Sequence, residues 1–215
     1  TVRLGGGGAL RITSFSEIEN LTGGASSSDL FQFQAGGTLN GGTISGGDTA
    51  GNDTVEGDSA ANAFVLDGDN SGTVDIGTGV NFVGIEVLDG GAGDDSFTVA
   101  TTGGPTGMSL IGGADDDALT GSSADETFNL TGAGEGTLTR GGVVINFSEM
   151  EDLDGAGGSN TLTFAGGGSI AGTVSNFDNV TLTSAGGANA DTITVQLNPT
   201  TGILEVVKFD QVAMT

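Results

Sequence analysis

The sequence contains no cysteine, histidine, tryptophan or tyrosine, and only two of its 215 residues are proline. Without cysteine, the chain forms no disulfide bond and no zinc–thiolate site. Only four residues are basic, namely Arg3, Arg11, Arg140 and Lys208. They are scattered, so the sequence offers no basic patch for nucleic acid. No signal peptide or transmembrane segment is visible.

The charge that is present is almost all negative. Aspartate and glutamate number 28, and the formal net charge is −24. Such a chain repels nucleic acid and anionic membranes, and it repels itself unless cations intervene. We therefore expect no nucleic-acid partner and no membrane insertion. The carboxylates are open to two interpretations, a solvated surface that resists aggregation or a set of metal ligands.

Glycine is abundant, at 43 residues, but it follows no three-residue period, which excludes collagen. Short runs alternate small polar with apolar residues, the period of a strand with one buried face. Examples are Thr73–Ile76, Ser96–Val99, Thr127–Leu130, Thr161–Phe164 and Thr192–Val195. Diglycine and Asp-Gly steps separate the runs. The pattern predicts an all-β fold.

A longer repeat organises these runs. The segment after Phe15 (FSEIENLTGG) recurs after Phe82 (FVGIEVLDGG) and Phe147 (FSEMEDLDGA), and weaker copies start at Phe177 and Phe209. The spacing indicates units of about 30–33 residues, as in repeat folds. We predict a parallel β-helix or β-solenoid with coils of about 30 residues over 1–215, with an antiparallel β-sandwich as the alternative.

The same repeat alternates acidic and apolar residues. The apolar residues Ile18, Ile85 and Met150 are expected in the core. The acidic residues around them are expected to form a solvent-facing acidic ladder, comprising Glu17, Glu19, Glu86, Glu149, Glu151 and Asp152.

The strongest short motif is Gly90–Thr98 (GGAGDDSFT), which fits the nonapeptide GGxGxDxUx, where U is a large apolar residue. Gly112–Thr120 and Gly186–Thr194 are near matches, and Gly155–Thr163 is degenerate. Gly57–Val65 aligns with Gly121–Asn129. These segments resemble the RTX (repeats-in-toxin) family, in which aspartates and turn carbonyls bind Ca²⁺ between successive turns.

The resemblance implies a calcium site, and hard carboxylate oxygens suit Ca²⁺ better than a transition metal. The candidate metal ligands are Asp94, Asp95, Asp115, Asp116, Asp117 and Asp125. The alternative is that these aspartates only shape turns, since Asp side chains hydrogen-bond their own backbone.

An enzymatic function is not expected. Parallel β-helices that act on acidic sugars use histidine, tyrosine, arginine or lysine, of which this chain has few or none. Its many carboxylates lie in glycine-rich turns that predict solvated side chains, not the pair that a glycosidase needs.

The repeats and the composition resemble the glycine-rich β-strand-repeat regions of large bacterial surface and adhesin proteins. The resemblance implies a secreted, extracellular or cell-surface structural segment. We expect part of a longer array or a polymerising subunit, associating end to end into filaments and contacting other biofilm-matrix components. The alternative function is a calcium-dependent carbohydrate- or surface-binding adhesin module.

Overall fold

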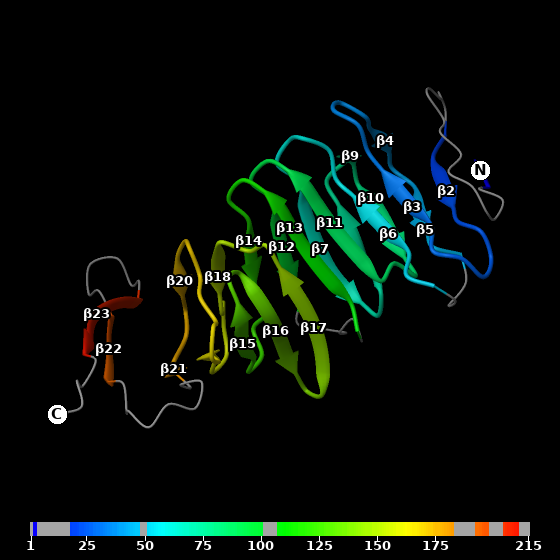
Figure 1. The fold of residues 1–215 in the computed structure, drawn as a ribbon. Helices are drawn as coiled ribbons and strands as arrows, with labels where there is room; N and C mark the ends of the chain where they lie inside the picture. Colours follow the sequence, from blue (N-terminus) through cyan, green and yellow to red (C-terminus); the bar gives the residue numbers. More distant parts are fainter. Residues whose placement is uncertain are drawn as a thin grey trace.

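The computed structural model describes residues 2–3, 18–47, 51–100, 107–182, 192–197 and 204–210. All regular structure in these ranges is β-strand. They contain no helix long and apolar enough to cross a membrane. Two large sheets run side by side along the molecule (Figure 1). The prediction of an all-β fold is confirmed.

The first sheet, sheet A, has ten strands in the spatial order β1 (Val2–Arg3), β2 (Asn20–Thr22), β5 (Thr43–Ser45), β10 (Val80–Val83), β8 (Ser71–Val74), β7 (Ala63–Gly68), β12 (Ser96–Val99), β14 (Ala118–Thr120), β18 (Asp152–Asp154) and β20 (Val174–Ser175). The second sheet, sheet B, has nine in the order β3 (Leu30–Gln32), β6 (Thr54–Glu56), β11 (Val87–Ala92), β13 (Ser109–Ala114), β17 (Val143–Ser148), β16 (Glu135–Arg140), β15 (Thr127–Gly132), β19 (Thr161–Phe164) and β21 (Asn179–Leu182). Two small pairs are β4 (Leu39–Asn40) with β9 (Gly77–Thr78), and β22 (Thr192–Leu197) with β23 (Leu204–Asp210).

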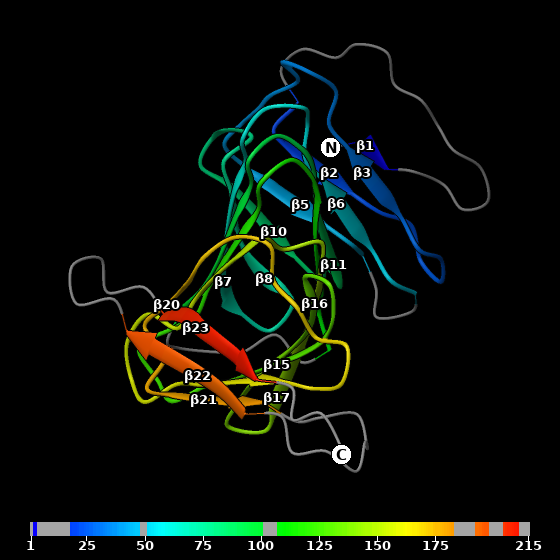
Figure 2. The same ribbon diagram turned by 60° about the vertical axis from the view of Figure 1, so that its left-hand side comes forward.

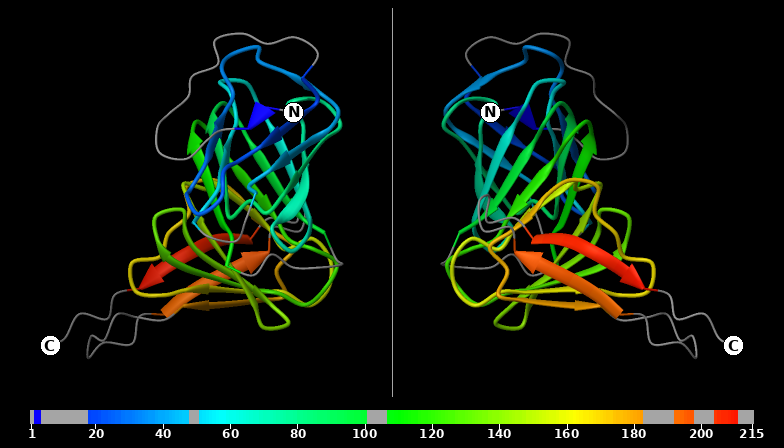
Figure 3. Two further views of the ribbon diagram at one scale, coloured as in Figure 1. Left: turned by 90° about the vertical axis from the view of Figure 1, so that its right-hand side faces the viewer. Right: turned by 90° about the vertical axis from the view of Figure 1, so that its left-hand side faces the viewer.

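The chain passes repeatedly between sheets A and B, as the two opposite views of Figure 3 show. A strand pairs in parallel with the strand of an earlier visit to the same sheet, so that Leu88 lies opposite Leu110 and Phe97 opposite Leu119. Matching turn residues are 22 apart at Asp95 and Asp117 but 34 apart at Asp117 and Glu151. The spacing therefore departs from the single value near 30 that the Phe repeat predicts.

Two antiparallel meanders account for the longer spacing. In sheet A, β7, β8 and β10 form one, and in sheet B, β15, β16 and β17 form the other. A β-carbon at Gly72 in β8 would lie 2.7 Å from Cζ of Phe82, and one at Gly136 in β16 would lie 2.8 Å from Cζ of Phe147. Glycine is thus needed where a phenylalanine ring of the third strand crosses the second.

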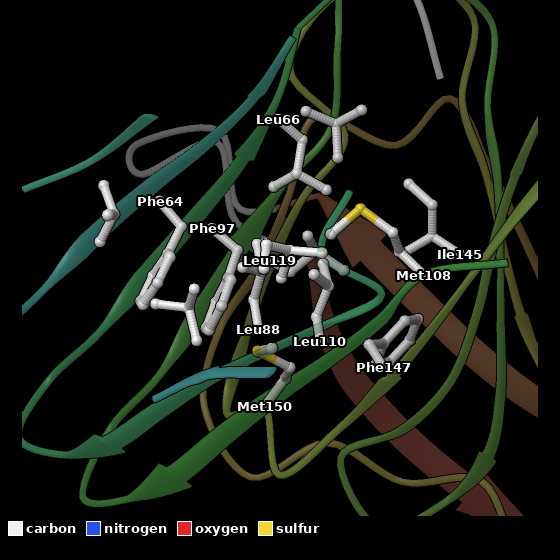
Figure 4. Close-up of a cluster of buried hydrophobic side chains, with 14 of the residues drawn as sticks. Phe64, Leu66, Leu88, Phe97, Met108, Leu110, Leu119, Ile145, Phe147 and Met150 are labelled. Atoms are coloured by element: carbon white, nitrogen blue, oxygen red, sulfur yellow. The ribbon is translucent and has the colours of Figure 1, made fainter. Parts of the chain in front are cut away.

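Apolar side chains from both sheets fill the space between them. Figure 2 shows β7 and β8 of sheet A across the interior from β11 of sheet B. The rings of Phe64 and Phe97 stack with centroids 4.9 Å apart, next to Leu88 and Leu119 (Figure 4). Ile85 and Met150 are fully buried, as their place in the Phe repeat predicts.

Two facing sheets are common to the two layouts considered from the sequence, the solenoid and the sandwich. Both sheets are mixed, with parallel and antiparallel neighbours.

Candidate functional site

Equivalent positions of the nonapeptides share the same polarity and the same burial. Their sixth residues are polar yet buried, namely Asn62, Asp95, Asp117, Glu126 and Asn160. Their eighth residues lie in the core, at 1% exposure or less, namely Phe64, Phe97, Leu119, Phe128 and Leu162. A buried polar residue therefore immediately precedes each strand, and the second residue of the strand is a buried apolar residue.

The buried polar residues stack into columns along the edges of the sheets. In one column the Asn62 N–H donates to Asp95 Oδ1 at 2.6 Å, and the Asp95 N–H donates to Asp117 Oδ1 at 2.7 Å. The Asp117 N–H donates in turn to Glu151 Oε2 at 2.9 Å. Each carboxylate thus satisfies a buried backbone donor of the preceding turn, which would otherwise cost about 1–3 kcal/mol.

Two more columns follow the same rule before strands of sheet B. Asp29 and Asp53 donate their N–H groups to Asp53 Oδ1 and Glu86 Oε2. Glu126 and Asn160 donate theirs to Asn160 Oδ1 and Asp178 Oδ2. The columns therefore hold most neighbouring turns together through side chains as well as through the sheets.

The columns correct one expectation from the sequence. In the expected acidic ladder Glu19 and Glu149 are exposed and Glu17 lies outside the described residues, but Glu86 and Glu151 were also expected to face solvent. Instead each is half-buried and accepts a backbone N–H from the preceding turn, that of Asp53 for Glu86 and that of Asp117 for Glu151. Asp95 and Asn160 accept the same kind of N–H across equally long sequence separations, so the glutamates fill the role that shorter side chains fill in the other columns.

Two kinds of turn precede the buried polar residues. In the first kind, the side chain also accepts an N–H of its own turn: Ser122 donates to Glu126 Oε2 at 2.9 Å, and Asp58 donates to Asn62 Oδ1 at 2.9 Å. The Asn160 amide instead donates to the carbonyl oxygens of Gly155 and Gly157, both at 2.7 Å. All three side chains therefore form hydrogen bonds within their own turns.

The diglycine turns are the second kind. Gly91 and Gly113 have φ of 95° and 112°, a conformation that favours glycine. The Gly91 N–H is directed to Asp89 Oδ1 at 3.1 Å. As a result, Oδ2 of Asp95 and Oδ2 of Asp117 are buried without a hydrogen-bond partner in the part of the chain that the structure describes.

Burial raises the pKa of Asp95 to about 7 and that of Asp117 to about 6, and neighbouring carboxylates act in the same direction. Burial also raises the pKa of Asp89, helped by the charge of Glu56. By contrast, the N–H groups of Ala60 and Gly36 lower the pKa of the partly exposed Asp58. The Asp95–Asp117 pair is thus the place where negative charge is least compensated, and a proton or a cation would relieve it.

The six predicted metal ligands divide into three groups, two on the turns of Asp95 and Asp117 and the third consisting of Asp125 alone. Asp95 and Asp117 are buried and adjacent. Asp94, Asp115 and Asp116 are exposed on the same two turns, where the Asp116 N–H donates to Asp94 Oδ1 and the Gly93 N–H to Asp115 Oδ2, both at 3.2 Å.

Asp125 belongs to a different edge, because its turn leads from β14 in sheet A to β15 in sheet B. There it accepts the Ser159 N–H at 2.8 Å. Across the described ranges, no three acidic side chains converge in an arrangement that could hold a metal ion. Oxygen ligands for a hard cation would therefore come from the Asp95–Asp117 pair together with backbone carbonyls and water.

Sequence reasoning missed Asn62, Glu126 and Asn160, which occupy the same sixth position as Asp95 and Asp117. The alignment of the nonapeptides contains the signal, because a polar residue recurs there while the fifth position varies. Choosing residues by charge selected Asp125, whose exposed side chain lies beside the buried Glu126.

Glu126 also has a charged partner. Arg140 Nη1, from β16 of the second meander, lies 3.7 Å from Glu126 Oε1, and the glutamate side chain is fully buried. The same nitrogen donates to the Ala100 carbonyl oxygen at 2.7 Å. This ion pair holds the second meander against the column.

Comparison of the chain with protein-family models, with curated proteins and with solved structures gives no match.

Proposed function

We propose that the chain is an extracellular structural segment of a bacterial surface or biofilm-matrix protein, folded as a parallel β-solenoid and without catalytic activity. The observation that carries this proposal is the stacking of the sixth-position residues. Each one accepts from, or donates to, the equivalent residue of a neighbouring turn. Such columns grow by adding turns, so they suit a long array.

The use of the carboxylates supports a passive role. The buried ones accept backbone N–H groups, and most of the others lie in exposed turns. A catalytic pair would require two carboxylates that face a shared substrate space with different pKa values. Asp95 and Asp117 face the inside of their own turns, against Gly90 and Gly112.

End-to-end assembly follows from the sheet edges. In the described part of the chain, sheet A ends at β20 and sheet B at β21, and the two end strands offer unpaired backbone groups to another copy. Electron microscopy of the purified protein tests the proposal. Rods that lengthen with concentration are expected, whereas compact particles at every concentration would contradict it.

Calcium is a second part of the proposal, and it depends on the unpartnered Oδ2 atoms of Asp95 and Asp117. A bound Ca²⁺ would supply positive charge and oxygen coordination to these buried carboxylates. The other sixth-position residues are satisfied by their own turns, as Glu126 and Asn160 show, and we assign them no metal.

Thermal melts with EDTA and with millimolar calcium test this part. We expect calcium to raise the melting temperature of the wild type and to have a much smaller effect on Asp117→Asn. The matched control is Asp125→Asn, which removes one carboxylate on another edge and should keep the calcium response. Identical melting curves with and without calcium would refute the assignment.

A further inference from the structure

The outward side of sheet B carries a neutral surface that the structural proposal does not use. Ten outward-facing side chains on β17, β16, β15, β19 and β21 form two parallel rows. We call them the Thr/Asn face, comprising Val144, Asn146, Thr137, Thr139, Thr127, Asn129, Thr161, Thr163, Asn179 and Thr181. None of the ten is charged, on a chain whose net charge is −24.

The pairing registers make the rows continuous. In one row Asn146 lies opposite Thr137, Thr137 opposite Asn129, Asn129 opposite Thr163 and Thr163 opposite Thr181. The second row runs beside it from Val144 to Asn179 through the same strands. Their partners along each strand, such as Phe128 and Leu162, are buried, so the rows face outward.

The first row continues beyond the Thr/Asn face. Ser109, Val87, Thr54 and Leu30 extend it across the rest of sheet B, again without a charge. Leu30 at 54% exposure and Val144 at 40% are two of the large apolar side chains that the described residues leave exposed. Acidic side chains border the rows on the same strands: Glu135 precedes Thr137 by two residues, and Asp89 and Glu56 follow Val87 and Thr54 by two residues.

Sheet A repeats the pattern on its own outward side. Its row runs from Asn81 through Thr73, Val65 and Thr98 to Thr120. Compared with the row from Asn146 to Thr181, it differs only in having valine in place of the central asparagine. The sheet A row is interrupted by charge, however, because Thr120 lies opposite Asp154 in the next strand.

We propose that the Thr/Asn face is a lateral docking surface for a second copy of this chain. Charge selects this face, because two chains of −24 can approach most closely where neither carries a carboxylate. The spacing of side chains on the face favours a second copy of this chain as the partner. Side chains repeat about every 4.8 Å within each row, and the Thr/Asn face of another copy has the same repeat, so the two faces can interdigitate.

The area of the Thr/Asn face indicates how strongly two copies should associate. The five strands of the Thr/Asn face at about 4.8 Å, with two rows covering a width of about 10 Å, give roughly 240 Å² per copy. A standard interface buries about 800 Å² per partner, so one pair of chains should associate weakly and reversibly. Carboxylates at the rims repel across the interface, so association should strengthen as salt screens them.

This inference goes beyond the end-to-end assembly proposed above and does not depend on it. Small-angle scattering in EDTA separates the two, because lateral pairing widens the cross-section whereas end-to-end stacking lengthens the particle. We expect the cross-section to widen at high protein concentration in about 1 M salt, and much less in about 10 mM salt.

The test uses Thr137→Glu combined with Thr163→Glu, which should weaken lateral association at least about tenfold, since facing like charges cost several kcal/mol. The matched control places the same two charges on exposed turns, with Ser59→Glu combined with Ser159→Glu. Thr137→Val with Thr163→Val keeps the face neutral and should preserve association. A cross-section that stays single in high salt, or that widens equally in the Glu double variant, would overturn the proposal.

Discussion

Replacing Asp95 by asparagine should stabilise the protein at neutral to alkaline pH in EDTA. The substitution keeps an oxygen to accept the Asn62 N–H, which Asp95 Oδ1 binds at 2.6 Å. It replaces the unpartnered Oδ2 by an amide donor. Asn160 is the internal precedent, because its amide at the same position donates to two turn carbonyls at 2.7 Å.

The magnitude follows from the pKa. Burial raises the pKa of Asp95 from 3.8 to about 7, and each unit corresponds to about 1.4 kcal/mol, so the full shift corresponds to about 4 kcal/mol. Local relaxation and water screen part of this, and we expect about 2 kcal/mol. For a domain of this size that is a rise in melting temperature of about 4–8 °C.

The pH dependence of stability tests whether the raised pKa of Asp95 causes this effect. Between the unfolded and folded pKa values the folded protein binds more protons than the unfolded one, so this group makes stability fall as pH rises from about 4 to about 7. The advantage of Asp95→Asn should therefore shrink as the pH is lowered toward 4.

The assay is thermal or urea denaturation in EDTA across this pH range. The control is Asp94→Asn, which changes an exposed neighbour and should have little effect. The reasoning is refuted if Asp95→Asn lowers stability at pH 8, or if its effect is independent of pH.

Three further substitutions test the packing. Arg140→Met should cost about 3–5 kcal/mol because it leaves the buried Glu126 carboxylate without its cation, and adding Glu126→Gln should recover much of this in a urea double-mutant cycle. Gly90→Ala should lower the melting temperature sharply, because its β-carbon would overlap the Gly112 carbonyl and a buried carboxylate, whereas Gly141→Ala, with open space around it, should cost only about 1 kcal/mol. Phe97→Ala should cost about 3–5 kcal/mol in the same denaturation assay, because the ring is fully buried and stacked on its neighbour; a loss below about 1 kcal/mol would contradict the described core.

Much of the fold could be predicted because its signal is local. The alternation of polar and apolar residues gave β12 and β19 with the bounds seen in the structure, and the Phe repeat gave buried Ile85 and Met150. Phe15, which begins the first copy of the repeat, lies outside the described residues.

The meanders could not be predicted in the same way. Strand direction in β8 and β16 depends on contacts with distant strands, and the feature that permits it is a glycine that gives room to a phenylalanine ring. The amino-acid composition does not distinguish Gly72 and Gly136 from the other glycines. The candidate site was predicted in part for a similar reason, because neighbouring aspartates such as Asp94 and Asp95 differ only in the direction of their side chains.

The placement of the two meanders has a consequence for curvature. Each one adds two strands to a single sheet, the first to sheet A and the second to sheet B. An unbalanced addition would make one side of the molecule longer than the other and bend the long axis toward the shorter side. Because the second insertion lies on the opposite side, the two bends cancel over one pair of repeats. Deleting β16 and β17 together, so that β15 takes the place of β17 beside β13, should therefore turn a straight particle into an arc.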